Sequence, residues 1–389
     1  MKYDFDKAID RSNTDSIKYD FAKERGKPEG LLPMWVADMD FSVPPEALAD
    51  IQKVVSHGIF GYTDVKDDYY EAVIGWFEGR FNYPVTRDEI VKTPGIVFAI
   101  TAAVRAYTNP GDSVMIQTPV YYPFYSIVLD NGRELVKNPL IYKDGKYFID
   151  FEDFEHKAAE HNVKLFILCS PHNPVGRVWT RKELETLNEI CERYGMIVVS
   201  DEIHCDFVYD GHIHTMFGRL NENAVICTAP SKTFNLAGLQ VSNIFIKNIE
   251  LRRKLNLEIY RSGYSQLNTI GLAACKSVYL HGGEWLNQLK VYLAGNINLV
   301  RNFLTEKLPG IKLVDPEGTY LLWLDCRDLG FSQTELDNLV TQKAKLWLSS
   351  GTIFGDDGDG FQRINIACPK AMLETALGRL EKAVLSEKE

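Results

Sequence analysis

The feature that most constrains the fold is a series of short, fully apolar runs that each end in polar residues. Two of these runs are MIVVSDE at 196–202 and VICTAPSK at 225–232; SVMIQTP, LFILCSP and VSNIFIK are of the same kind. They are short, rich in β-branched residues and bounded by loop residues, which is typical of strands. Strands that are apolar on both faces are covered on both faces. The pattern therefore predicts an α/β chain with a mostly parallel central sheet and helices on either side.

Helical periodicity between these runs supplies the covering layers. Thr180 with Glu183 three residues later forms a capping-box pattern, apolar residues then recur at helical spacing, and Gly195 provides a stop signal. Further helices are predicted over 46–56 and 96–108. Strand, helix and strand in succession form the right-handed crossover unit of parallel sheets.

The character of the chain changes after about residue 285. A long helical pattern covers 286–308, and the strand GTYLLWLD, a helix opening at Ser332, the strand FQRINIA and the final amphipathic helix ETALGRLEKAVL follow. We therefore expect three parts: an N-terminal arm (1–44) that packs with the small domain, a large domain (45–285) and a small α+β domain (286–389).

Composition excludes several classes of function. The formal net charge of −10 argues against nucleic-acid binding and against docking on an anionic membrane. No apolar run reaches the roughly 18–20 residues of a membrane span, and the polar N-terminus does not resemble a signal peptide. The seven cysteines are scattered, with no CxxC pair and no metal spacing. We expect buried free thiols, no metal and a cytoplasmic location.

Two ionisable residues stand at successive strand ends, Asp201 and Lys232. The carboxyl ends of neighbouring parallel strands are where open α/β sheets bind ligands. Asp201 could be a helix N-cap or a salt-bridge partner, and Lys232 could be a solvated surface lysine. Together, however, they provide an acid that keeps a pyridinium protonated and an amine that forms a Schiff base. These are the groups that pyridoxal 5'-phosphate (PLP) requires, so the functional interpretation is favoured.

A third strand ends in SPHNPVG at 170–176. This segment could be a Pro-rich turn, or Asn173 could donate its amide to the phenolic oxygen of the cofactor. His204 could approach the same oxygen or serve only as a structural hydrogen bonder. The helix that opens after Thr93-Pro94-Gly95 presents backbone N–H groups of the kind that bind anions.

These pieces together resemble the fold type I PLP enzymes, the aspartate aminotransferase superfamily, over nearly the whole chain. The markers of one branch, the cystathionine β-lyases or C–S lyases, are PMWVADMDF at 33–41, FGYT at 60–63, TPVYYPF at 118–124, SPHNPVG at 170–176, SDEIHCDF at 200–207, SKTFNLAGLQ at 231–240, EGTYLLWLD at 317–325 and RINIACP at 363–369. The resemblance implies the PLP-dependent transferase-like fold, with a mostly parallel sheet and a smaller α+β domain.

The resemblance also implies roles for individual residues around the cofactor ring. Lys232 would be the Schiff-base lysine and proton shuttle, and Asp201 would pair with the ring nitrogen. Asn173 and His204 would flank the phenolic oxygen, and Tyr121 would stack on the ring.

Phosphate and substrate contacts are implied in the same way. The backbone amides of Ile96 and Val97, with Ser231, would hold the phosphate, and Tyr62 would reach the phosphate of the other subunit in a homodimer with shared active sites. Arg363 would bind the substrate α-carboxylate, assisted by the backbone at Ala37. The sequence departs from the wider superfamily at Gln240, where many members carry a phosphate-binding arginine.

The implied activity is a PLP-dependent C–S β-lyase. It would cleave L-cystathionine or other S-derivatives of L-cysteine to a thiol or sulfide, pyruvate and ammonia. An aminotransferase remains the alternative, because its early steps are identical and no residue type separates the two. A PLP-binding regulatory protein is disfavoured by the short arm and acidic charge, although a protein–protein role beside catalysis stays open.

Overall fold

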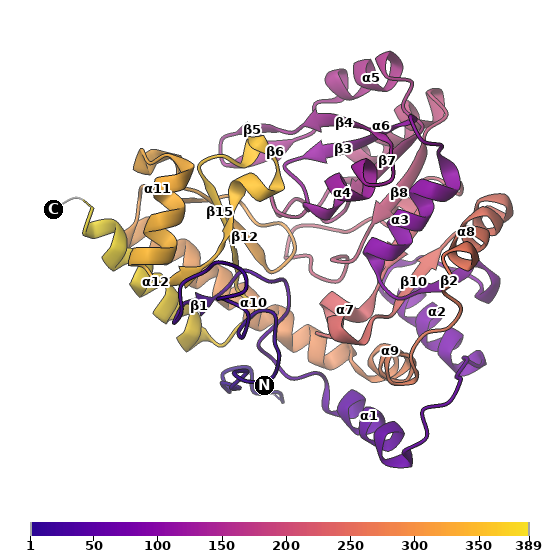
Figure 1. Ribbon diagram of the computed structural model, residues 1–389, viewed down its shortest axis with the longest axis horizontal. Coiled ribbons are helices and arrows are strands. Elements are labelled where there is room, and N and C mark those ends of the chain that lie inside the picture. Colours follow the sequence, from indigo (N-terminus) through magenta and orange to yellow (C-terminus); the bar gives the residue numbers. More distant parts are fainter. Residues whose placement is uncertain (1, 388–389) are drawn as a thin grey trace.

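The centre of the molecule is a seven-stranded sheet. The computed structural model describes residues 2–387, and Figure 1 shows the sheet with helices packed around it. In spatial order its strands are β2 (Ile90–Thr93), β10 (Ser242–Phe245), β9 (Val225–Thr228), β8 (Ile197–Asp201), β7 (Leu165–Cys169), β3 (Ser113–Thr118) and β4 (Glu134–Pro139). From β9 to β4 all neighbours run parallel, which confirms the predicted mostly parallel α/β architecture.

Strand β10 is the exception, because it lies antiparallel to both β9 and β2. Parallel neighbours need a crossover connection across one face of the sheet. After β9 the chain instead forms the single-turn helix α7 (Pro230–Thr233) and a 3₁₀ turn (Ala237–Leu239), and then returns directly along β9. This short return leaves α7 at the end of the sheet rather than on its face.

Helices cover both faces of this sheet, as the apolar strands predict. The helices are α1 (Pro45–His57), α2 (Asp67–Phe81), α3 (Ile96–Tyr107), α4 (Pro123–Leu129), α5 (Phe151–Glu160), α6 (Arg181–Arg193), α8 (Ile249–Arg261) and α9 (Thr269–His281). Alternate strand residues fall into two separate cores: Leu165 and Ile167 pack with α3, α4 and α8, whereas Phe166 and Leu168 pack with α2, α5, α6 and α9.

The capping signals define α6 as the sequence indicates. Thr180 Oγ1 accepts a hydrogen bond from Glu183 N at 3.2 Å, and Glu183 Oε2 accepts one from Thr180 N at 2.7 Å. The helix ends at Arg193, and Gly195 adopts a left-handed conformation with φ of 66°. The helices predicted over 46–56 and 96–108 are present as α1 and α3.

A second, smaller sheet follows in sequence. Its strands are β11 (Lys312–Leu313), β12 (Leu321–Asp325), β15 (Phe361–Asn365) and β14 (Ser349–Ser350), and its helices are α10 (Gly283–Lys307), α11 (Gln333–Asn338) and α12 (Lys370–Leu385). The helix predicted to open at Ser332 is shorter than its pattern, because a π turn at Leu339–Lys343 widens the backbone and lets Ala344 N reach Leu339 O at 2.8 Å.

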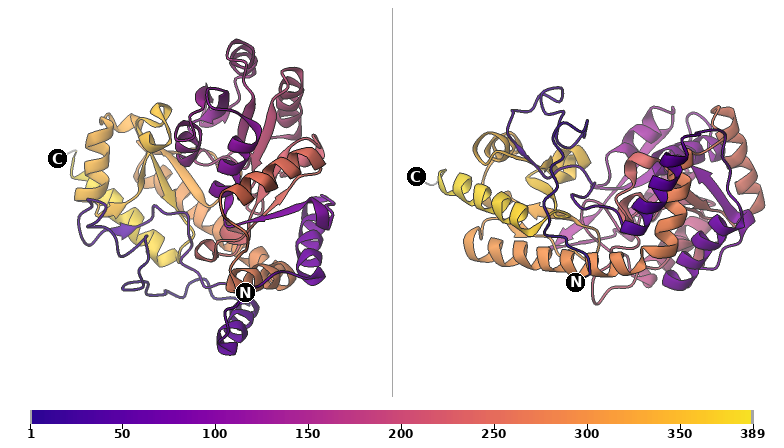
Figure 2. Two further views of the ribbon diagram at one scale, coloured as in Figure 1. Left: turned by 45° about the vertical axis from the view of Figure 1, so that its right-hand side comes forward. Right: turned by 90° about the horizontal axis from the view of Figure 1, so that it is seen from below.

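The N-terminal arm is mostly irregular but is joined to this smaller unit. Its strand β1 (Leu32–Pro33) pairs in parallel with β13 (Leu346–Trp347), and Asn365 N donates to Met34 O at 2.9 Å. Figure 2 shows the indigo arm beside the yellow α12, and the long orange α10 extending from the smaller unit toward the large sheet. The division near residue 285 stays a prediction. A small hairpin, β5 (Ile141–Lys143) with β6 (Lys146–Phe148), completes the elements.

Three observations bear on the predictions from composition. None of the helices within residues 2–387 is long and apolar enough to cross a bilayer. All seven cysteines are buried and free. Within the same residues, no three His, Cys, Asp or Glu side chains form a group that could hold a metal ion.

Candidate active site

A cavity of about 660 Å³ lies where the carboxyl ends of β7, β8 and β9 meet. The register places Asp201, the last residue of β8, opposite Cys169 of β7 and Cys227 of β9. All but one of the predicted site residues line this cavity: Ala37, Ile96, Val97, Tyr121, Asn173, Asp201, His204, Ser231, Lys232 and Arg363. The parallel order of the three strands brings Asn173, Asp201 and Lys232 together, and the arm, the start of α3, the segment after β3 and strand β15 supply the other residues.

Asp201 supplies a buried carboxyl group to the cavity. Only 4% of the residue is exposed, and Ile203 N donates to its Oδ1 at 3.1 Å. No cationic group of residues 2–387 lies within 4 Å of it, so the salt-bridge alternative is excluded within that range. Burial raises the pKa of Asp201 to about 7, with a further contribution from Glu202. The Ile203 N–H and the more distant Lys232 favour the carboxylate too weakly to offset its burial, so a cation brought in by a ligand would stabilise it further.

Lys232 presents its amine from α7, the short helix after β9. The Nζ atom donates to Ala37 O at 2.8 Å. Burial lowers the pKa of Lys232 to about 8, and Arg363 acts in the same direction while Asp38 and Asp201 oppose it. The residue is thus not a solvated surface lysine. A substantial fraction of its amine is neutral near physiological pH, which suits a nucleophile and base.

Arg363 on β15 is a buried guanidinium that has no counter-ion among the described residues. It is 4% exposed, and burial lowers its pKa to about 10. Nη1 donates to Asn173 Oδ1 at 2.9 Å and Nη2 to Trp35 O at 2.8 Å, whereas Nε has no partner among the described residues. No carboxylate of residues 2–387 lies within 4 Å of it. A buried charge of this kind needs an anionic partner, which a substrate carboxylate provides.

Two further polar side chains face the same space. Because Asn173 Oδ1 accepts from Arg363, its amide NH₂ is left as the donor toward the cavity. Burial lowers the pKa of His204 to about 3, and Lys232 and Arg363 add to the effect, so the imidazole is neutral. The His204 Nδ1 atom has no partner among the described residues. It therefore makes no structural hydrogen bond through that nitrogen.

The start of α3 forms a cradle at one end of the cavity. Gly95 precedes the helix with φ of 153°, a conformation that side chains rarely adopt. The first turn at Ile96 and Val97 has no side-chain cap, and both residues line the cavity, as does Ser231. Uncapped N–H groups at a helix start bind phosphate well. Gln240 lines the same cavity as an uncharged amide.

Tyr62 is the predicted site residue that lies elsewhere. It is 98% exposed in the loop between α1 and α2, next to Ile59 and Phe60, which are 69% and 59% exposed. It does not line the cavity of its own chain. Its predicted contact with a second subunit stays a prediction.

Sequence reasoning missed other lining residues, including Arg25, Trp35, Phe98, Tyr122, Ser349 and Ile353. Trp35 belongs to the PMWVADMDF motif, so its position was available from the pattern. Arg25 lies in the irregular arm and carries no local signal.

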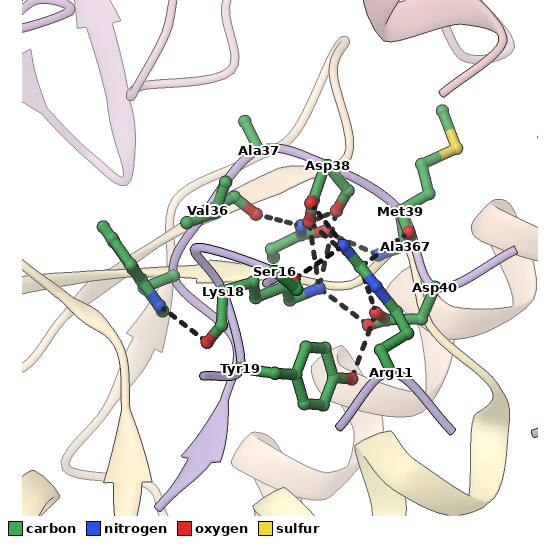
Figure 3. A network of polar contacts seen from close by, with 12 residues as sticks. Arg11, Ser16, Lys18, Tyr19, Val36, Ala37, Asp38, Met39, Asp40 and Ala367 are labelled. Atoms are coloured by element: carbon green, nitrogen blue, oxygen red, sulfur yellow. Dashed lines mark hydrogen bonds and ion pairs between the residues drawn. The ribbon is translucent and has the colours of Figure 1, made fainter. Parts of the chain in front are cut away.

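The segment 35–39 is held rigidly against the cavity. Asn365 Nδ2 donates to both Val36 O and Asp38 O at 2.6 Å, and Met39 N donates to Asn235 Oδ1 at 2.9 Å. Figure 3 shows Asp38 and Asp40 drawn into a network with Arg11, Lys18 and Tyr19. The carbonyl of Ala37 that accepts from Lys232 is thereby fixed in place.

The cavity matches the requirements of PLP feature by feature. The carboxyl of Asp201 has no cation within 4 Å among residues 2–387, the amine of Lys232 is partly neutral, and an uncapped helix start faces the same space. These fit, respectively, a protonated ring nitrogen, an aldehyde and a phosphate.

Comparison with known proteins agrees with this assignment. Residues 32–380 match the family described as aminotransferase class I and II. The chain is 44% identical to the cystathionine beta-lyase PatB of Bacillus subtilis, over 98% of this chain and 99% of the relative, and 31% identical to protein MalY of Escherichia coli, over 98% and 99%.

A solved structure agrees over the whole length. Cystalysin from Treponema denticola, which contains a pyridoxal 5'-phosphate cofactor, superposes with a TM-score of 0.96 at 37% identity and covers 100% of both chains. The chain therefore belongs to the aminotransferase class I and II family of PLP-dependent enzymes, in the branch of the cystathionine β-lyases.

Proposed function

We propose that this protein is a PLP-dependent C–S β-lyase that cleaves L-cystathionine or other S-derivatives of L-cysteine to a thiol, pyruvate and ammonia. The observation that carries the proposal is one cavity in which the Lys232 amine, the Asp201 carboxyl and the Arg363 guanidinium converge. Two relatives named cystathionine beta-lyase favour a lyase over an aminotransferase.

We propose the following cofactor contacts from this geometry. Asp201 pairs with the ring nitrogen, Asn173 and His204 donate to the phenolic oxygen, and Tyr121 stacks on the ring. The amides of Ile96 and Val97, with the Ser231 hydroxyl, hold the phosphate. When bound, PLP supplies an electron sink that stabilises negative charge at the substrate Cα.

The protein groups then direct the proton and the leaving group. Arg363, assisted by the backbone at Ala37, binds the α-carboxylate and orients the Cα–H bond. The neutral amine of Lys232 takes the Cα proton, because its pKa of about 8 keeps enough of it unprotonated near pH 7.5. The electron pair of the C–H bond forms the Cα–Cβ double bond, and the Cβ–S pair leaves on sulfur. The ammonium of Lys232 returns its proton to that sulfur, so the leaving group departs as a thiol and the amine is regenerated. Released 2-aminoacrylate hydrolyses to pyruvate and ammonia.

The decisive test measures pyruvate formed by the holoenzyme from L-cystathionine with no keto acid present. Many turnovers of pyruvate, with thiol in equal amount, are expected. Pyruvate that appears only after a keto-acid acceptor is added would identify an aminotransferase instead.

We also propose a homodimer in which Tyr62 reaches the phosphate held by the other subunit. The exposed Ile59, Phe60 and Tyr62 in one loop support this, because a cluster of large exposed apolar side chains is typical of an interface. Light scattering should give twice the chain mass, and Tyr62→Phe should weaken PLP binding in an absorbance titration. A monomer that binds PLP fully would contradict the proposal.

We propose the cytoplasm as the location of the protein, which the seven free thiols support.

A further inference from the structure

The N-terminal arm is anchored beside the cavity by buried ion pairs (Figure 3). Lys18 is 2% exposed, and its Nζ lies 2.7 Å from Asp40 Oδ2. Arg11 bridges Asp38 and Asp40, with both contacts at 2.7 Å, and the Tyr19 hydroxyl donates to Asp40 Oδ1 at 3.0 Å. Charged groups removed from water in this way hold a segment in one geometry. The ion pairs therefore fix the position of the backbone at Lys18 and Tyr19, from which the rest of the arm continues.

The next part of the arm places a guanidinium over an aromatic platform. Arg25 N is shared between Phe21 O and Ala22 O at 3.2 Å each, which folds this stretch into a turn. The Arg25 guanidinium carbon then lies 5.2 Å from the centre of the Trp35 ring. Trp35 stacks on Trp347 with ring centroids 4.4 Å apart and an interplanar angle of 9°. The stacked pair supports the guanidinium through a cation–π contact.

Arg25 faces the same cavity as the catalytic groups. It is exposed, and no carboxylate of residues 2–387 lies within ion-pair distance of it. Trp35 contacts both arginines. The ring of Trp35 lies against the Arg25 guanidinium, and the backbone carbonyl of Trp35 accepts a hydrogen bond from Arg363 Nη2 at 2.8 Å. The cavity is thus lined by two guanidinium groups that have no counter-ion within residues 2–387, one of them buried (Arg363) and the other exposed (Arg25).

Two cations at different depths fit a substrate with two carboxylates. Arg363 is 4% exposed and takes the α-carboxylate next to the reacting carbon. A second carboxylate would be on the group attached to sulfur, which extends from Cβ toward the mouth. A short S-alkyl group carries no charge that Arg25 could bind.

We propose that Arg25 is a specificity-determining residue that binds a carboxylate of the leaving group. The enzyme accordingly prefers S-substituted L-cysteines whose sulfur substituent carries a carboxylate to S-alkyl cysteines. Cystathionine is a substrate of the preferred kind. This inference rests on the β-lyase function proposed above.

The test compares two substrates on the PLP-loaded enzyme. The values of kcat/KM for L-cystathionine and S-ethyl-L-cysteine are measured by pyruvate release in the wild type, Arg25→Gln, Arg25→Lys and Lys23→Gln. Lys23 is an exposed lysine of the same turn that does not line the cavity, so its variant is the matched control. PLP affinity of each variant is measured separately by absorbance titration.

We expect Arg25→Gln to lower kcat/KM for cystathionine roughly two- to fivefold through KM, as for an exposed ion pair, and to leave S-ethylcysteine unchanged. Arg25→Lys should recover part of the loss, and Lys23→Gln should behave as the wild type. High salt should reduce the preference of the wild type for cystathionine but have less effect on Arg25→Gln.

Two outcomes would overturn the assignment of Arg25. The first is an unchanged ratio of the kcat/KM values of the two substrates in Arg25→Gln, whether both values stay constant or both fall equally. The second is a loss of PLP affinity, which would place Arg25 at the phosphate. In each case cleavage by the wild type leaves the lyase function intact. A wild-type holoenzyme that cleaves neither substrate would instead remove the lyase function and this inference together.

Discussion

The buried carboxyl of Asp201 should make the stability of the PLP-free protein depend on pH. Its pKa rises to about 7 in the folded state, from roughly 3.9 in an unfolded chain. The folded state therefore binds more protons than the unfolded state between these values, and stability falls as pH increases through this window. Across the whole window the free energy of unfolding falls by about three pKa units at 1.36 kcal/mol each, or roughly 4 kcal/mol. About 1.5 kcal/mol of this decrease has already occurred at pH 5.

Asp201→Asn removes this titration with little change of shape. Urea unfolding of both PLP-free proteins between pH 5 and 8 should show the wild type losing about 2–3 kcal/mol relative to the variant as pH rises. Saturating PLP should reduce the drift in the wild type, because a protonated ring nitrogen compensates the carboxylate. If the free energy of unfolding changes with pH equally in the two PLP-free proteins, Asp201 does not titrate as a desolvated carboxyl.

Two further substitutions test the substrate clamp and the arm. Arg363→Lys should lower kcat/KM for any amino-acid substrate about ten- to a hundredfold while the absorbance of bound PLP is kept, since a lysine cannot reproduce the guanidinium fork; equal kinetics would place the α-carboxylate elsewhere. Lys18→Met should lower the free energy of unfolding by about 2 kcal/mol, because Asp40 loses one charged partner but keeps Arg11 and Tyr19, whereas Lys23→Met on the exposed face of the arm should stay within about 0.5 kcal/mol; equal effects of the two in urea melts would show that the buried pair contributes nothing.

Local signals predicted the parts of the fold that local chemistry determines. The apolar runs ending at Cys169, Asp201 and Thr228 became β7, β8 and β9, and their parallel order is enough to bring their polar ends to one edge. The capping pattern of Thr180 and Glu183 fixed the start of α6 for the same reason, since both hydrogen bonds lie within one turn.

Features that depend on tertiary contacts were not predictable in this way. The reversed direction of β10 follows from how 229–241 turns back at the sheet end, which no periodicity records. Lys18 lies in a polar stretch of the kind that is usually exposed to solvent. It is buried instead because its amine donates to the carboxylate of Asp40, twenty-two residues later. Arg25 lines the cavity with its guanidinium over the Trp35 ring, a contact that depends on the tertiary fold and has no local signal.

We propose that Lys232 binds PLP covalently and that Asp201 pairs with the ring nitrogen of the cofactor. Reducing the holoenzyme with borohydride, digesting it and locating the phosphopyridoxyl group by mass spectrometry tests this most directly. We expect one labelled peptide, modified at Lys232, and no label in Lys232→Ala. A label on another lysine, or none on a protein saturated with PLP, would contradict it.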